Sequence, residues 1–150
     1  MSAVEHNYEV SVAWLTDRKG VMTSPELTTS VEVATPPQFP KGMDGIWSPE
    51  HLFVASVNSC LMTTFLAIAE NSKLEYISFK SKAVGKLEMV DGKYMMSEVT
   101  LMPEIEIADE QQKERAERVL QKSESNCLIS NSVKSKIIFQ PSIKIASLII

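Results

Sequence analysis

The two cysteines, Cys60 and Cys127, are the residues of this sequence best suited to chemistry. Free cysteine is often a buried and inert small hydrophobe, which is the simplest interpretation of Cys60. The small polar neighbours Asn58 and Ser59 suggest instead that Cys60 is not completely shielded from solvent. Cys127 lies in the polar segment SESNCLISNS. Two thiols without a recognisable export signal indicate a thiol–disulfide couple rather than a structural disulfide.

The other residue types give little support for metal binding or serine-dependent hydrolysis. The histidines are His6 and His51, and neither a CxxC nor an HxxxH spacing occurs. His51 could join Cys60 and Cys127, but a structural zinc site takes four such ligands. The serines and histidines form no recognisable Ser-His-Asp pattern. We therefore expect no metal site.

A reactive thiol needs a stabilised thiolate, and a nearby cation is one way to provide it. Arginine suits this role because it stays charged and offers a planar fork of donors. The sequence has three arginines, Arg18, Arg115 and Arg118. Arg115 and Arg118 are expected on a polar helix face, and Arg18 follows the first predicted strand in a charged turn. From the residues alone, a solvated surface charge is the simplest interpretation of each.

The composition is that of an ordinary soluble protein. The chain has 150 residues, a hydrophobic content of 44% and a net charge of −4, so residues 1–150 are predicted to form a single domain. The absence of a basic stripe argues against nucleic acid as a partner. The N-terminal sequence MSAVEHNYEVSV lacks the basic and then apolar pattern of a signal peptide, which predicts a cytoplasmic location and reduced thiols.

The uncharged segment Leu52–Ala69 predicts the helix that carries Cys60. Ser48 can cap its start, and Pro49 suits the first helical turn. A surface helix would show a charged face, so we expect this helix to be buried on most sides. Five polar side chains within the segment favour a buried helix of a soluble protein over a membrane span.

The rest of the chain predicts an α+β fold with a largely antiparallel sheet. Asp91-Gly92 is a strong signal for a two-residue hairpin turn, and Pro103 is expected to loosen the end of the strand after it. Asp109 can cap a second helix, with Gln112 completing a capping box. Alternating residues predict strands at 8–14, 21–23, 27–34, 77–89, 94–101, 137–139 and 143–150, with a turn at 16–20 ended by Gly20 and a long loop at 35–47.

Three features together resemble the OsmC/Ohr family, which comprises the osmotically inducible protein C and the organic hydroperoxide resistance proteins. They are the segment WSPEHLFVASVNSCLMTTFLAIA, the distant CLISNS, and an arginine in the first hairpin. The P-E-x-L-x(7)-C pattern is fairly specific when a late cysteine accompanies it. The similarity runs from about Tyr8 to Ile145. Asn-Ser before Cys60 and Leu-Ile after Cys127 replace the Ala-Ala and Cys-Pro of many members, so the chain is most similar to the OsmC-like branch.

The resemblance implies an OsmC-like fold, with antiparallel sheets wrapped around a long buried central helix in an intertwined homodimer. It also implies a thiol-dependent peroxidase that reduces organic hydroperoxides, and hydrogen peroxide as well. Cys60 would become a sulfenic acid, and Cys127 would resolve it as a disulfide. Arg18 would stabilise the Cys60 thiolate, and Glu50 would orient Arg18. The expected partners are a second copy of the chain, the hydroperoxide substrate and an external dithiol, which is a lipoylated protein in Ohr-type members. No bound cofactor, nucleic acid or membrane is expected.

The spacing of Glu50 and Cys60 limits how they can cooperate. Ten positions correspond to about 15 Å along a straight helix, which a glutamate side chain cannot span. Either the helix breaks near its start, or Glu50 acts across a subunit boundary. A dimer with a shared site fits the second alternative.

Two other functions remain open beside the peroxidase. A non-enzymatic dimer could bind an apolar ligand under the loop at Phe39–Trp47, its cysteines being incidental. A redox sensor could signal the oxidation of Cys60 and Cys127 to a partner, although no DNA-binding charge pattern favours this. Turnover of an organic hydroperoxide with a dithiol separates the enzyme from both.

Replacing Arg18 by lysine is expected to slow peroxide reduction at neutral pH about tenfold or more, equivalent to about 1.4 kcal/mol in the barrier. Lysine cannot reproduce a two-pronged contact with Glu50 and sulfur. Glu50→Gln should cause a smaller defect in the same direction. The measurement is the pH dependence of Cys60 alkylation and of peroxide turnover. Identical curves for wild type and Arg18→Ala would mean that Arg18 is not the cation that activates Cys60.

Overall fold

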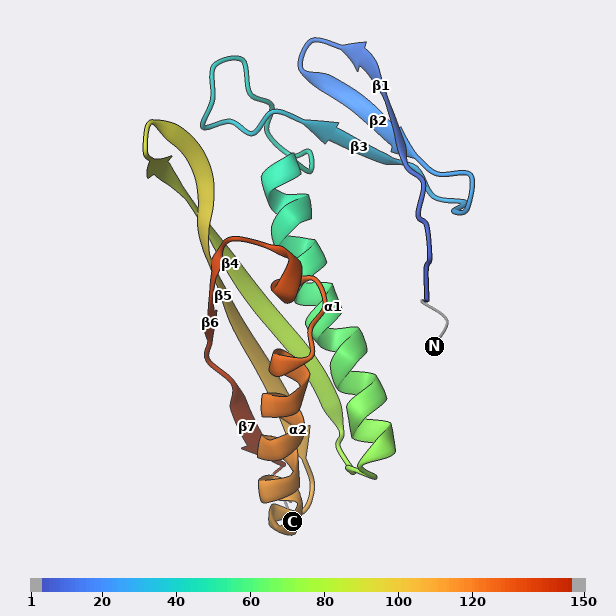
Figure 1. Ribbon diagram of the computed structural model, residues 1–150, viewed down its shortest axis with the longest axis vertical. Helices are drawn as coiled ribbons and strands as arrows, with labels where there is room; N and C mark the ends of the chain where they lie inside the picture. The colour runs from blue at the N-terminus through green and yellow to red at the C-terminus, as the bar shows by residue number, and fades with distance from the viewer. Residues whose placement is uncertain (1–3, 147–150) are drawn as a thin grey trace. The chain divides into compact units, whose positions relative to one another are not determined.

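The computed structural model describes residues 4–146 of the chain. Its contacts divide into two compact units, Met1–Leu52 and Phe53–Ile150, which are described separately below. The first unit is an antiparallel sheet with the strand order β1-β2-β3 (Figure 1). Its strands are β1 (Ser11–Thr16), β2 (Lys19–Thr23) and β3 (Val31–Ala34).

The turn between β1 and β2 is tighter than the sequence predicts. It consists of Asp17 and Arg18, and the residue with positive φ is Asp17, at 50°. We predicted that Gly20 ends the turn, and this is wrong, because Gly20 already lies within β2. Its missing side chain matters there, since a Cβ would lie 2.7 Å from the carbonyl oxygen of Ala13 on the paired strand. Aspartate can adopt the left-handed region locally, so the turn needs no glycine.

The predicted long loop, residues 35–47, contains neither helix nor full strand. Two backbone hydrogen bonds nonetheless fold it back on itself, and one of them joins its last residue to β3. The N–H of Ala34 donates to the carbonyl of Trp47 at 2.9 Å, and the N–H of Met43 donates to that of Thr35 at 2.9 Å. These bonds bring the loop back beside β3 before the first helix begins.

The first helix, α1 (Pro49–Asn71), is continuous over 23 residues. Ser48 caps it as predicted: the backbone N–H of His51 donates to Ser48 Oγ at 3.1 Å, and Ser48 is fully buried. The continuity of α1 contradicts the alternative of a break near its start. Ten residues of a continuous α-helix correspond to a rise of about 15 Å, so Glu50 cannot reach the Cys60 of its own helix.

The second unit is a sheet with helices α1 and α2 against one of its faces (Figure 1). Strands β4 and β5 form a long antiparallel hairpin whose turn is Asp91-Gly92, as predicted, with positive φ at both residues. The last two strands pair with β5 in parallel and are the exception to the largely antiparallel pairing that we predicted. The elements are β4 (Ser78–Val90), β5 (Lys93–Ile107), η1 (Glu110–Gln112), α2 (Lys113–Ser125), η2 (Ser130–Ser132), β6 (Lys136–Phe139) and β7 (Ser142–Ile145).

Pro103 does not end β5, contrary to the prediction. The carbonyl of Leu101 accepts from the N–H of Gln140, so alternate residues of β5, including Pro103, turn their backbone groups toward β6 and β7. Pairing with β6 stops at Leu101, and pairing with β7 resumes at Glu104. Pro103 falls in the gap, where its missing N–H leaves no partner unsatisfied. The last part of the predicted strand 143–150, residues 147–150, lies outside the described residues.

In the single chain, α1 buries one face, whereas we predicted burial on most sides. Its buried residues pack against β5 and α2, and its opposite face leaves Met62 39% and Leu66 40% exposed. By length and composition α1 is the one helix among the described residues that could also cross a membrane. The buried residues of α1 are Val57, Cys60, Leu61, Phe65 and Ala69.

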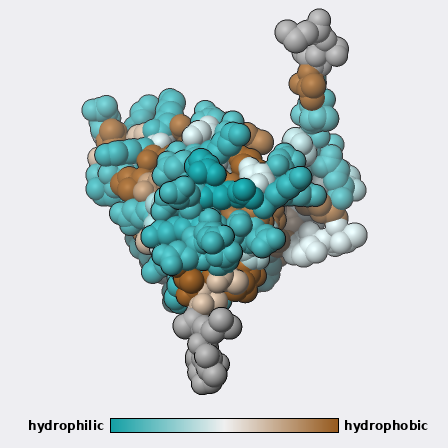
Figure 2. Space-filling model, turned by 90° about the horizontal axis from the view of Figure 1, so that it is seen from below, coloured by the Kyte–Doolittle hydropathy of each residue, from teal (hydrophilic) through white to brown (hydrophobic). Residues whose placement is uncertain are grey.

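Helix α2 follows a short 3-10 turn that Asp109 caps, its carboxylate accepting from the N–H of Gln111 at 2.9 Å. Gln112 does not complete the predicted capping box. Its side-chain oxygen accepts instead from the N–H of Glu75, at 3.3 Å. Seen from below, the visible face of the molecule is mostly hydrophilic, in keeping with the charged outer side of α2 (Figure 2). The buried side of α2 consists of Ala116, Val119, Leu120 and Ser123.

Candidate active site

The second unit brings Cys60 and Cys127 together from 67 positions apart in the sequence. Cys60 lies on the buried face of α1 and is 9% exposed, and Cys127 follows the end of α2 and is completely buried. Both thiols are free. The Cys127 Sγ lies 4.0 Å from the carbonyl oxygen of Val57, one helical turn before Cys60, and is close enough to the Cys60 thiol to influence its pKa.

The segment CLISNS owes its position to the end of α2 and to a helical turn of its own. The N–H of Asn126 donates to the carbonyl of Lys122 at 3.1 Å, which closes α2. The N–H of Asn131 then donates to the carbonyl of Cys127 at 3.1 Å, and the N–H of Ser132 to that of Ile129 at 2.9 Å. This turn folds the residues after Cys127 back over Cys60.

Hydrogen bonds lower the pKa of Cys60. Burial is the largest single influence and would raise the pKa, because it disfavours the charged form. The backbone N–H of Ile129, the thiol of Cys127, the hydroxyl of Thr64 and the backbone N–H of Leu128 all favour the thiolate, and together they outweigh burial. Thr64 lies one turn further along α1, with its Oγ1 3.9 Å from the Cys60 Sγ. The donors therefore favour a Cys60 thiolate without a charged partner among the described residues of the second unit.

Cys127 is shifted in the opposite direction. Burial raises its pKa, and the neighbouring Cys60 raises it further, while the hydroxyl and the backbone N–H of Ser130 only partly oppose this. Two adjacent titratable groups whose environments separate their pKa values are suited to different roles. Cys60 is the thiol that ionises first, and Cys127 is the thiol that keeps its proton.

Sequence reasoning missed these donors. It looked for a cation, whereas the structure stabilises the Cys60 thiolate with the N–H groups of Leu128 and Ile129 and with the hydroxyl of Thr64. The spacing of Cys60 and Thr64, four positions apart on a helix, was a signal that could have revealed the hydroxyl. The two backbone donors depend on the tertiary position of the turn after Cys127, which no local pattern discloses.

Arg18 and Glu50 belong to the first unit, and the cysteines to the second. Arg18 is exposed in the β1–β2 turn and lines a hollow of about 590 Å³ together with Trp14 and Pro49, the residue before Glu50. Within residues 4–146 there are four ion pairs, and none includes Arg18 or Glu50. Their approach to the thiols stays a prediction.

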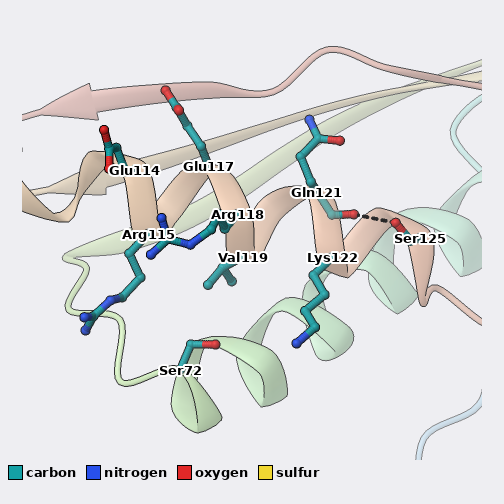
Figure 3. A pocket seen from close by; sticks show the side chains of 9 residues that line it. All are labelled: Ser72, Glu114, Arg115, Glu117, Arg118, Val119, Gln121, Lys122 and Ser125. Atoms are coloured by element: carbon teal, nitrogen blue, oxygen red, sulfur yellow. Dashed lines mark hydrogen bonds between the residues drawn. The ribbon is translucent and has the colours of Figure 1, made fainter.

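The other two arginines line a separate surface hollow of about 940 Å³ on α2 (Figure 3). Arg115 and Lys122 point from α2 toward the end of α1, where Ser72 lies, and Glu117 points the opposite way. Arg115 Nη1 donates to the carbonyl of Lys73 at 3.1 Å. Neither arginine is among the groups that shift the pKa of Cys60. Across the described part of the chain, no three His, Cys, Asp or Glu side chains group closely enough to hold a metal ion.

Comparison with known proteins places the chain in a family. Residues 42–142 match the family described as OsmC-like protein. The chain belongs to the OsmC-like family. A relative from Bacillus subtilis, the uncharacterized protein YmaD, is 23% identical over 91% of this chain and 92% of its own length.

Solved structures of OsmC/Ohr proteins share the fold. An OsmC-like protein of unknown function from Vibrio cholerae superposes with a TM-score of 0.81 at 22% identity, over 91% of this chain and 99% of that chain. An organic hydroperoxide resistance protein from Elizabethkingia anophelis has a TM-score of 0.76 at 19% identity, over 97% and 100% of the two chains. These likenesses confirm the predicted α+β, OsmC-like fold.

Thr64→Val should raise the pKa of Cys60 and move the midpoint of its alkylation to higher pH. The Thr64 hydroxyl lies 3.9 Å from the sulfur and, as a donor to the thiolate, favours the ionised form, so its loss raises the pKa. At neutral pH the alkylation rate should fall by about threefold or more, since a hydrogen bond to a charged group is worth more than a neutral one. Rates of iodoacetamide labelling of Cys60 across pH provide the measurement.

Thr63→Val is the matched control for this substitution. The Thr63 hydroxyl donates to the backbone carbonyl of Cys60 at 3.1 Å, not to its sulfur. The control should therefore leave the alkylation midpoint at the wild-type pH. Equal shifts in the two variants would show that helix distortion, rather than the Thr64 hydroxyl, controls Cys60.

Proposed function

We propose that this protein is a thiol-dependent peroxidase that reduces organic hydroperoxides, and hydrogen peroxide as well, through Cys60 and Cys127. The observation that carries the proposal is the pair of adjacent thiols with pKa values shifted in opposite directions. A lowered pKa provides a nucleophilic thiolate near neutral pH. A neighbouring thiol provides the partner that converts an oxidised sulfur into a disulfide. Membership of the OsmC-like family supports the same chemistry.

The reaction has three steps that balance without a bound cofactor. The Cys60 thiolate attacks the terminal oxygen of the hydroperoxide, the O–O bond breaks, and the alkoxide leaves as an alcohol after taking up a proton. Cys60 is then a sulfenic acid. Cys127 attacks this sulfur as a thiolate, the S–O bond breaks, and hydroxide leaves as water after protonation. An external dithiol, for example a lipoylated protein, reduces the Cys60–Cys127 disulfide by thiol–disulfide exchange.

Arg18 and Glu50 complete the site in this proposal, in an intertwined homodimer. Helix α1 is continuous, so Glu50 lies about 15 Å along the helix from the Cys60 of its own chain. A second chain can instead bring its Arg18 and Glu50 to Cys60. The guanidinium would then add a cation to the donors of Thr64 and the CLISNS turn, and the Glu50 carboxylate would hold it in place.

Two features of the single chain support the homodimer. Only 28% of the most apolar 18-residue stretch of α1 is buried within one chain. The strand β1 is exposed along its whole length, including Val12 at 68% and Trp14 at 76%. Soluble proteins seldom leave such apolar surfaces facing water, and a second copy is the simplest cover.

One equivalent of an organic hydroperoxide should convert the reduced protein into a monomer-internal Cys60–Cys127 disulfide that a dithiol reverses. The two thiols are close enough for each to influence the pKa of the other, so the second step needs little rearrangement. Mass spectrometry of non-reduced peptides identifies the product, and turnover with dithiothreitol or lipoamide measures the cycle. Cys127→Ser should stop at an oxidised Cys60. Sulfinic Cys60 beside a free Cys127 thiol in wild type would refute the resolving role.

Sedimentation at micromolar concentration should give twice the mass of one 16.7 kDa chain. The apolar surface of α1 and β1 makes a large interface, so dissociation should accompany unfolding. Leu66→Glu, on the exposed face of α1, should break the dimer, whereas Lys82→Glu on the exposed side of β4 should not. A folded and active monomer would contradict the shared site.

A further inference from the structure

One buried polar atom in the second unit has no hydrogen bond, and it lies beside the thiol pair. The hydroxyl oxygen of Ser130 is buried and has no partner of ordinary geometry. Nearly all buried polar groups in proteins are paired, so an exception calls for an explanation. Other serines nearby are paired with carbonyls: Ser132 Oγ donates to Leu128 at 2.8 Å, and Ser123 Oγ donates to Val119 at 2.6 Å.

The position of Ser130 relates it to Cys127 rather than to Cys60. It lies three positions after Cys127, on the same turn that the bond from Asn131 to the Cys127 carbonyl closes. Its hydroxyl and its backbone N–H both act on the Cys127 thiol and lower its pKa, against the effect of burial. The hydroxyl is thus close to Cys127 Sγ without forming a regular hydrogen bond to it in the reduced protein.

The reduced and ionised forms of Cys127 have different hydrogen-bond requirements. As a thiol, Cys127 is a donor and points toward the carbonyl oxygen of Val57, 4.0 Å away. As a thiolate it can only accept, and that carbonyl becomes a repulsive neighbour. A completely buried thiolate cannot turn to water for donors, so it must find them within the protein. The unpaired Ser130 hydroxyl is the side-chain donor available on the same turn.

We propose that Ser130 is a positioning residue for the resolving step: its hydroxyl donates a hydrogen bond to Cys127 Sγ when Cys127 loses its proton to attack oxidised Cys60. This inference rests on the proposed function for its role in catalysis. In the step, the Cys127 proton passes to solvent and an S–S bond forms at Cys60. The S–O bond of the sulfenic acid breaks, and hydroxide leaves and becomes water. Ser130 stays protonated throughout and stabilises the attacking sulfur.

The surroundings of Cys127 leave few other groups that could produce the same pH dependence. Cys60, on α1, is the titratable group that acts on Cys127, and it raises the pKa. Within residues 4–146, no carboxylate, imidazole or cation is among the groups that shift Cys127. Removing Cys60 therefore isolates the influence of Ser130. Arg18 is proposed to act on Cys60, so in the Cys60→Ala protein its effect is the same with and without the Ser130 hydroxyl.

The first experiment titrates Cys127 as the sole thiol of a Cys60→Ala protein, by the ultraviolet absorbance of the thiolate across pH. Ser130→Ala in this background should move the titration to higher pH. Ser132→Ala, which removes a hydroxyl bound to a carbonyl of the same turn, should leave it unchanged. Ser130→Thr and Ser130→Val are nearly equal in volume and differ in the hydroxyl, so they repeat the comparison if the alanine variant is unstable. The threonine protein should titrate at the lower pH.

The second experiment follows oxidation of the wild-type pair by rapid mixing with one equivalent of hydroperoxide. Ser130→Ala should leave sulfenic acid formation at Cys60 unchanged and slow disulfide formation about tenfold at neutral pH, an effect the size of one hydrogen bond to a charged group. With excess peroxide, more Cys60 should reach the sulfinic state. Raising the pH should restore the rate, which a merely structural defect would not do.

The outcomes separate this inference from the proposed function. An unchanged Cys127 titration in both Ser130→Ala and Ser130→Val would overturn the inference, and would show that the hydroxyl binds a water or only fills space. A failure of hydroperoxide to oxidise wild-type Cys60 would overturn the proposed function, while the titration would still decide whether Ser130 supports the Cys127 thiolate. A shifted titration with an unchanged rate of disulfide formation would remove Ser130 from the resolving step.

Discussion

The turn that follows α2 lies against the middle of α1, and the chemistry of both thiols depends on this contact. It places the Cys127 thiol 4.0 Å from the carbonyl oxygen of Val57, which lies one helical turn before Cys60 on α1. It also directs the N–H groups of Leu128 and Ile129 at the Cys60 sulfur. Without it, the N–H groups of Leu128 and Ile129 would no longer favour the Cys60 thiolate, and the pKa of Cys60 would rise. The packing of the second unit holds this turn against α1.

Support for the contact comes from apolar packing on both helices. Phe65 and Ala69 on α1 meet Val119 and Leu120 on α2 in one buried cluster, which fixes where α2 ends relative to α1. Burying a side chain of the size of Phe65, Val119 or Leu120 contributes roughly 1.5–3 kcal/mol. The hydrogen bonds to sulfur are worth less individually and cannot hold the helices in place. Packing therefore sets the geometry, and the donors then determine which thiol ionises first.

Local signals in the sequence were enough to predict elements, and too weak to predict how elements meet. The cap at Ser48, the hairpin at Asp91-Gly92 and the uncharged helix follow from rules of nearest neighbours along the chain, and the structure has them. Pro103 was misjudged because its place in β5 depends on a gap between two partner strands that join β5 from elsewhere in the sequence. The thiolate donors were missed for the same reason, since backbone N–H groups are present at every residue and carry no residue-type signal.

The pairing of Cys60 and Cys127 was predicted from residue types and a family resemblance, yet its asymmetry came only from the structure. Two buried thiols in equal surroundings would both resist ionisation, and each would raise the pKa of the other. Here the donors of Thr64, Leu128 and Ile129 converge on Cys60, whereas Cys127 has Ser130. The unequal number of hydrogen-bond donors thus determines the order of the two steps. Cys60, with more donors, reacts with the oxidant, and Cys127 keeps its proton until Cys60 is oxidised. A cation from a second chain would increase this difference, but the single chain already sets its direction.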